Sequence, residues 1–152
     1  MPTVYLASDF AAPMPSFPRV GVTLVREFLF TLTAALGAGD TIKLCPIPGA
    51  TDLVLDQWFL DVPDLDSNAT PLIALQLGDG TTADKFMAAG TVGQSAGKVN
   101  SRQNGVAGVL PLELIADAVL TVTVSTGPAT GASTGSIRGF MEYHMVGAPS
   151  PA

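Results

Sequence analysis

The chain has 152 residues, of which 47% are hydrophobic and 13% are charged, so its length suits one domain with its own core and its composition argues against disorder. The formal net charge of −6 argues against nucleic-acid binding and against binding to an anionic membrane surface, because both need clustered Lys and Arg. We therefore expect neither nucleic acid nor a membrane as a partner.

Residues 1–18 read as a Pro-rich N-terminal arm. Its prolines disfavour ladder hydrogen bonding and favour an extended chain. The arm nevertheless carries large apolar side chains, which are Val4, Tyr5, Leu6, Phe10 and Phe17. Leaving such a side chain in water forfeits roughly 1.5–3 kcal/mol of burial. Either the arm packs on its own domain or it packs on another chain, and we predict the second.

Residues 1–10 lack a basic stretch followed by a long apolar core, so they do not predict a secretory signal. No apolar run approaches the roughly 18 residues that a membrane span needs. We expect synthesis in the cytoplasm.

A β pattern begins at Arg19. Apolar residues alternate with others along the chain at Val20, Val22, Leu24, Phe28, Phe30 and Leu32. A helix over residues 25–36 is the alternative, but the aromatic and β-branched content favours a strand.

Three short apolar runs follow between Gly39 and Gly80. The first, 42–45, is expected to stop at Pro46, the second covers 53–62 and holds the only tryptophan, and the third covers 72–77. Turn residues separate the runs, which is typical of strands. In the third run Ile73, Leu75 and Leu77 share one face, as expected of a sheet with one face on a core.

Residues 82–89 predict a short helix, with Thr82 as its cap and with Phe86 and Met87 facing inward. Residues 91–108 are rich in Gly, Ser, Asn and Gln and predict a long loop with room for a short strand.

Strands are expected again near the C-terminus. Pro111 makes 109–114 an edge strand or an interrupted one, whereas 118–125 and 136–146 alternate regularly. Residues 126–135 form a low-complexity loop between them. The predicted fold is all-β, an antiparallel two-sheet sandwich of jelly-roll type with an extended N-terminal arm and at most one short helix. The expected parts are the arm at 1–18, the β-sandwich at 19–146 and a flexible tail at 147–152.

The residues that could carry chemistry are few. His144 is the only histidine and Cys45 the only cysteine, so an intrachain disulfide is impossible, and no serine has the surroundings of a nucleophile elbow. A cupin-type metal site needs several histidines. We expect a buried inert thiol at Cys45, a histidine facing solvent or a neighbouring chain at His144, no catalytic residues, no metal and no cofactor.

Asp64, Asp66 and Asn68 stand in a D-x-D-x-N array, as at the start of an EF-hand loop. The match fails further on, where Ala69 replaces the glycine and Leu75 stands at the position of the bidentate Glu. A strand-to-strand loop with Asx turns is therefore the better prediction. The aromatic residues Trp58, Tyr5 and Tyr143 could form a carbohydrate platform, but core or interface roles are favoured.

Several segments resemble a class of small structural proteins of tailed bacteriophages. They are GDTIKLCPIPGATDLVLD at residues 39–56, DLD at 64–66, LQLGDG at 75–80 and DKFMA at 84–88, and the resemblance extends over residues 27–146. The resemblance implies a capsid decoration, or cement, protein: a β-sandwich on the outside of the phage head, usually a trimer, that clamps subunits of the major capsid protein.

With this resemblance, the function expected is a structural virion protein on the outer capsid surface. Its expected partners are the major capsid protein and two further copies of the chain. The five apolar arm residues named above are the expected capsid or subunit contacts. The alternative is a phage fibre or carbohydrate-binding β module, which would show exposed aromatic residues in a groove.

Overall fold

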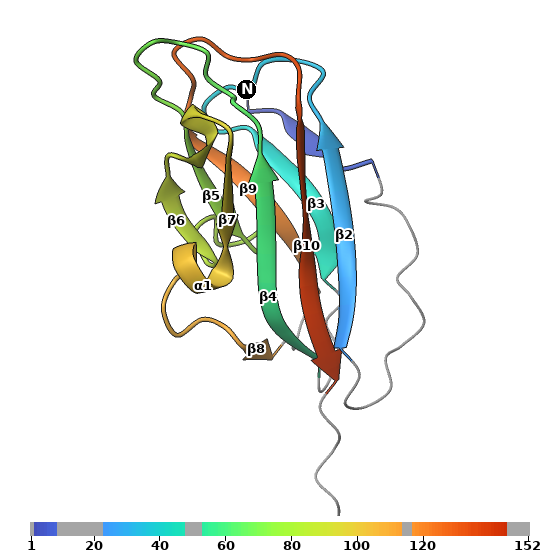
Figure 1. Cartoon of the computed structure of the whole chain (residues 1–152). Coiled ribbons are helices and arrows are strands. Elements are labelled where there is room, and N and C mark those ends of the chain that lie inside the picture. The colour runs from blue at the N-terminus through green and yellow to red at the C-terminus, as the bar shows by residue number, and fades with distance from the viewer. Residues whose placement is uncertain (1, 9–22, 48–52, 114–116, 146–152) are drawn as a thin grey trace, which may run out of the picture.

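The computed structural model of the chain describes residues 2–8, 23–47, 53–113 and 117–145. Figure 1 shows two sheets stacked as layers, with β2, β10 and β4 in front and β3, β9 and β5 behind. The strands are β1 (Val4–Leu6), β2 (Thr23–Thr31), β3 (Thr41–Ile47), β4 (Leu53–Val62), β5 (Ala74–Gly78), β6 (Met87–Gly90), β7 (Gly97–Asn100), β8 (Leu112–Glu113), β9 (Ala118–Thr126) and β10 (Ser136–Met145). The helical elements described are a 3-10 turn, η1 (Val92–Gln94), and one short helix, α1 (Ser101–Asn104).

The strand order is that of a jelly roll. Sheet A has the order β1-β3-β9-β5-β6, and sheet B has the order β2-β10-β4-β7, with β8 paired to β4. Strands β2 to β5 alternate between the two sheets, and so do β9 and β10. The last strands, β9 and β10, lie beside the early strands β3 and β2. Every described pairing is antiparallel except that of β1 with β3. The predicted all-β, jelly-roll sandwich is confirmed.

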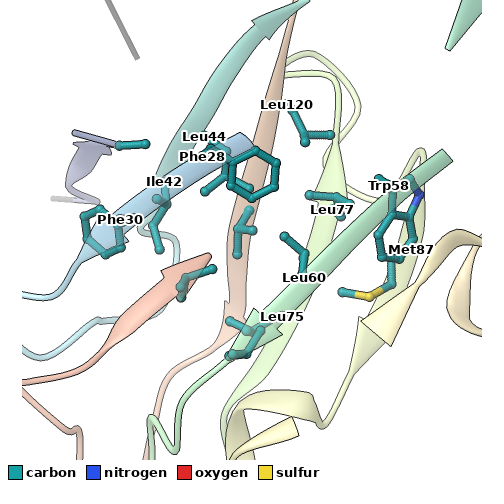
Figure 2. Packing of buried hydrophobic residues seen from close by; sticks show 14 of the residues in the cluster. Phe28, Phe30, Ile42, Leu44, Trp58, Leu60, Leu75, Leu77, Met87 and Leu120 are labelled. Atoms are coloured by element: carbon teal, nitrogen blue, oxygen red, sulfur yellow. The ribbon is translucent and has the colours of Figure 1, made fainter. Parts of the chain in front are cut away.

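Alternating side chains explain why these segments form strands that face a common core. Along β2 the inward positions are Arg26, Phe28 and Phe30, whereas Glu27 and Leu29 face outward. In β9 the inward side chains of Leu120, Val122 and Val124 are fully buried, as predicted. Figure 2 shows how side chains from both sheets meet between the layers, among them those of Phe28, Ile42, Leu44, Trp58, Leu60, Leu75, Leu77 and Leu120. Burial of each such side chain stabilises the domain by roughly 1.5–3 kcal/mol.

The helix predicted over residues 82–89 is wrong. The Asp79 side chain holds the start of this segment in a turn, because its Oδ1 accepts the backbone N–H groups of Thr81 and Thr82 at 2.9 and 2.7 Å. The Nζ of Lys85 lies 2.7 Å from the Asp79 Oδ2. The backbone N–H of Phe86 then donates to the Leu77 carbonyl at 2.8 Å, which starts β6 beside β5.

The short helix lies instead within the predicted long loop, at α1, directly after β7. The Oδ1 of Asn100 caps it by accepting the N–H groups of Arg102 and Gln103 at 3.0 and 3.1 Å. The short strand allowed for in this loop is β7.

Pro46 does not end the first run of the central segment, contrary to prediction. β3 continues through Pro46 to Ile47, after a register shift between Lys43 and Cys45 in its pairing with β9. The partner on the other side, β1, pairs with β3 only up to Lys43. Among the described strands, Pro46 therefore has a neighbour on one side alone, which is where a sheet tolerates proline.

Residues 4–6 form a strand that the sequence did not predict. β1 runs parallel to β3, with Val4 opposite Thr41 and Leu6 opposite Lys43. The edge strand expected at 109–114 is confirmed in part as β8, which is only two residues long and borders β4. The expected β positions Val20 and Val22 and the expected tail at 147–152 lie outside the described residues.

Candidate functional site

The described part of the N-terminal arm is joined to the domain at both of its ends. At the start, the Asp40 Oδ1 accepts the Thr3 N–H at 2.6 Å, and the Thr41 N–H donates to the Thr3 carbonyl at 2.8 Å. At the end, the Ala7 N–H donates to the Lys43 carbonyl at 2.9 Å. For residues 2–8 the prediction that the arm packs on another chain instead of its own domain is therefore wrong.

The two faces of β1 have different surroundings. The Tyr5 ring packs edge-on against the Phe30 ring, with centroids 5.6 Å apart, so this side chain joins the core. Val4 and Leu6 point the other way and keep 57% and 56% of their surface exposed. Of the predicted contact residues, Phe10 and Phe17 lie outside the described residues, so the contact role of the set stays a prediction.

A second apolar surface lies on the outer face of sheet B, and the arm prediction did not include it. Here four strands border a shallow open depression of about 740 Å³, which we call the sheet-B groove. Side chains from β2, β4, β7 and β10 line it, notably Leu29, Phe59, Asp61, Lys98, Arg138 and Phe140.

An aromatic pair lies at the centre of the groove. Phe59 of β4 is opposite Phe140 of β10, and their rings stack with centroids 5.5 Å apart and planes 17° from parallel. Two residues further along each strand, on the same face, Arg138 is opposite Asp61, and its guanidinium lies 2.9 Å from the Asp61 Oδ2. This ion pair is exposed and contributes at most about 1 kcal/mol to stability, so its main effect is to give the groove a polar rim.

Close approach of the two strands beneath this pair requires glycine at position 139. A Cβ at Gly139 would collide with the backbone carbonyl oxygen of Phe59 and press on the Phe28 ring. The aromatic pair is thus supported by a backbone contact that no other residue type fits.

Asp66 organises the loops at one end of the sandwich, as a structural rather than a metal-binding group. Its carboxylate is buried and accepts backbone N–H groups from two segments, namely Leu72 and Ile73 on one side and Ala129 and Thr130 on the other, at 2.7–3.2 Å. Burial alone would raise the pKa of this carboxyl, but these four donors outweigh it and hold the pKa well below its usual range. The Asx turns predicted for this loop are confirmed, since the Asp66, Asn68 and Thr70 N–H groups bond to side-chain oxygens two residues earlier.

The two residues singled out for possible chemistry lie apart from each other. The His144 Nδ1 is 2.6 Å from the Asp56 Oδ2, and both side chains are about 30% exposed. Cys45 is 1% exposed, and its Sγ lies 3.6 Å from the Met141 sulfur, which is an apolar setting for a thiol. Within the described ranges, no group of three or more His, Cys, Asp or Glu side chains could hold a metal ion, and no helix is long and apolar enough to cross a membrane.

Two chains in solved phage capsid structures are similar to this one. The first belongs to the capsid of Ralstonia phage GP4, with a TM-score of 0.78 and 30% sequence identity over 96% of this chain and 100% of that chain. The chain belongs to the same phage capsid protein family. The second belongs to the capsid asymmetric unit of cyanophage Pam1, with a TM-score of 0.66 and 25% identity over 89% of this chain and 95% of that chain. No family model matches the chain, and neither does any curated protein.

Membership of this phage capsid family directs attention to the outer surfaces of the sandwich, because capsid components assemble through surface contacts. The arm was found from its apolar residues among prolines. The sheet-B groove was missed, because the alternation predicted for residues 136–146 did not by itself say which face is outward. The cross-strand partner Phe59 could not be identified without the register of β10 against β4.

Proposed function

We propose that the chain is a structural virion protein that binds the outside of a phage head and stabilises the lattice of its major capsid protein. The observation that carries this proposal is the similarity to a chain of the Ralstonia phage GP4 capsid over the full length of that chain.

The surface of the domain supports a binding role. Exposed large apolar side chains occur on the outer strands at Val4, Leu6, Val25 and Leu29, whereas the inward faces of the same strands are filled. Many weak contacts of this kind suffice on a lattice, because every bound copy stabilises the assembled state by mass action and copies bound side by side reinforce one another. We propose that the chain acts as a homotrimer and makes these contacts without catalysis.

The test is binding to phage heads that lack this protein. Purified chain is added to such heads, the heads are sedimented, and the bound protein and the temperature of head disruption are measured. We expect saturable binding and a higher disruption temperature. Binding that does not saturate, or saturable binding to tails or fibres instead of heads, would contradict the proposal.

A phage fibre or carbohydrate-binding β module is the second candidate, and one observation bears on it. The sheet-B groove does present aromatic side chains, Phe59 and Phe140, between polar ones. Their rings stack on each other, however, so one face of each is already covered and little flat surface is left for a sugar ring. Binding to host-surface polysaccharide that Phe140→Ala abolishes would favour this candidate over the first.

A further inference from the structure

The sheet-B groove begins where the arm leaves the domain. Ser8 lines the groove, and its N–H and hydroxyl both donate to the Leu29 carbonyl, at 2.8 and 3.0 Å. Residues 9–22 follow directly, before β2 starts at Thr23. The edge of the groove at Ser8 is therefore also the point at which residues 9–22 begin, DFAAPMPSFPRVGV, a segment with two phenylalanines and three prolines.

The charges of the groove and of this segment match. The groove has two acidic side chains, Glu27 and Asp61, and two basic ones, Lys98 and Arg138, so they cancel. The segment has one of each sign, Asp9 and Arg19, whereas the whole chain has a net charge of −6. A neutral occupant avoids the repulsion that the chain's acidic surface would otherwise bring into such a contact.

The chemistry of the occupant also fits. Proline-rich segments bind grooves lined by aromatic side chains, because their extended backbone is already ordered and loses little entropy on binding. In the segment Phe17 lies between Pro15 and Pro18, which places an aromatic side chain in such a stretch. The partly exposed rings of Phe59 and Phe140 are the corresponding surface in the groove.

The length of the segment allows it to reach a neighbouring molecule. Its ends lie beside Leu29 and at Thr23, which are six residues apart on one strand, or about 20 Å at 3.3 Å per residue. Fourteen residues can extend to about 50 Å, so the middle of the segment can stand about 20 Å away from the line that joins its ends. That distance is about twice the separation of two packed sheets.

We propose that the sheet-B groove receives residues 9–22 of a neighbouring copy of the chain, with Phe17 seated against the Phe59–Phe140 pair. The proposal rests on the proposed function in so far as the assembly holds several copies. An arm that enters the groove of the next copy makes a head-to-tail contact, which closes into a ring such as a trimer when the rotation between successive copies closes. Reciprocal exchange of arms between two copies would instead give a two-fold dimer.

The test is cross-linking between two variants that each add one cysteine, Ser16→Cys beside Phe17 and Lys98→Cys in the groove. The two variants are mixed in equal amounts, and a bifunctional maleimide about 10 Å long is added, a reach set by the roughly 10 Å spacing of packed layers. The native thiol, Cys45, is buried, and the unsubstituted chain serves as the control for its reactivity. We expect a covalent pair that contains one copy of each variant. Failure to form this pair would overturn the proposal, as would a link that forms only within a doubly substituted chain, because the segment would then occupy its own groove.

Truncation of the aromatic residues is the second arm of the test. Phe17→Ala and Phe140→Ala should each weaken self-association at least tenfold, whereas Val106→Ser, which changes an exposed apolar residue outside the groove, should leave it unchanged. Melting temperatures identify any variant that fails to fold, and Phe17→Ala alone then decides. Undiminished association of a folded Phe17→Ala variant would refute the contact.

Measuring head binding together with cross-linking distinguishes a failure of the arm contact from a failure of the proposed function. If the unsubstituted chain binds heads but the two cysteine variants form no cross-linked pair, the arm contact alone is wrong. If the pair forms but no head binding occurs, the proposed function is wrong and the contact between copies stands.

Discussion

Substitutions on the two faces of β1 should have opposite effects on stability and on assembly. Tyr5 packs against Phe30, whereas Val4 and Leu6 are more than half exposed. Complete burial of a large aromatic side chain contributes about 3–5 kcal/mol relative to Ala, and the Tyr5 ring is only partly buried, so Tyr5→Ala should lower the free energy of unfolding by about 2 kcal/mol. For a domain of this size that corresponds to a melting temperature lower by about 4–8 °C.

The outward variants Val4→Ser and Leu6→Ser are the matched controls for this stability change. Because their side chains are mostly in solvent, each should change the free energy of unfolding by no more than about 0.5 kcal/mol. Combined, they should weaken attachment to heads about tenfold, or 1.4 kcal/mol.

Urea unfolding followed by tryptophan fluorescence measures the stability of all three variants. Trp58 is the only tryptophan and is 1% exposed in the folded domain, so its emission reports exposure of the core. A Tyr5→Ala variant as stable as the unsubstituted chain would refute the packing of β1 on its own domain. The arm would then pack on another chain, as its sequence predicted.

Further substitutions test the loops, the groove and the absence of chemistry. Because the pKa of Asp66 is depressed in the folded state, the carboxylate contributes its full stabilisation above about pH 4 and loses it as the pH falls toward the folded pKa. Below about pH 4 the melting temperature of the unsubstituted chain should therefore fall more steeply with pH than that of Asp66→Asn. Gly139→Ala should give misfolded or strongly destabilised protein, judged by solubility and melting temperature, whereas Gly90→Ala, whose Cβ would meet its nearest neighbour at an ordinary 3.7 Å, should behave like the unsubstituted chain. Cys45→Ala and His144→Ala should keep full binding to heads, and loss of binding by either folded variant would reveal a site at that residue.

Strands with one buried face could be predicted from the sequence, because alternation alone identifies them. The bounds expected for β4, residues 53–62, are those observed, β9 ends one residue later than expected, and β10 begins at the expected residue and runs to the last described one. The jelly-roll type was predicted from the number and spacing of such strands, whereas the order of the strands in each sheet was not.

Features that depend on partners far along the chain could not be predicted in this way. β1 is held by Asp40, 37 residues from Thr3, and nothing in the local pattern of the arm reveals that contact. The carboxylate of Asp66 binds the N–H groups of Ala129 and Thr130, which are 63 and 64 residues further along the chain. In residues 82–89 the local pattern favoured a helix, and the Asp79 side chain together with pairing to β5 overrode it.

The central claim is that this capsid-family protein binds the outside of the head, and a cryo-electron microscopy map of the intact virion tests it most directly. The account predicts density for the jelly roll on the outer surface of the shell, grouped as rings of three copies and in contact with the major capsid protein. Density for the domain inside the shell, or confined to the tail or fibres, would contradict the claim.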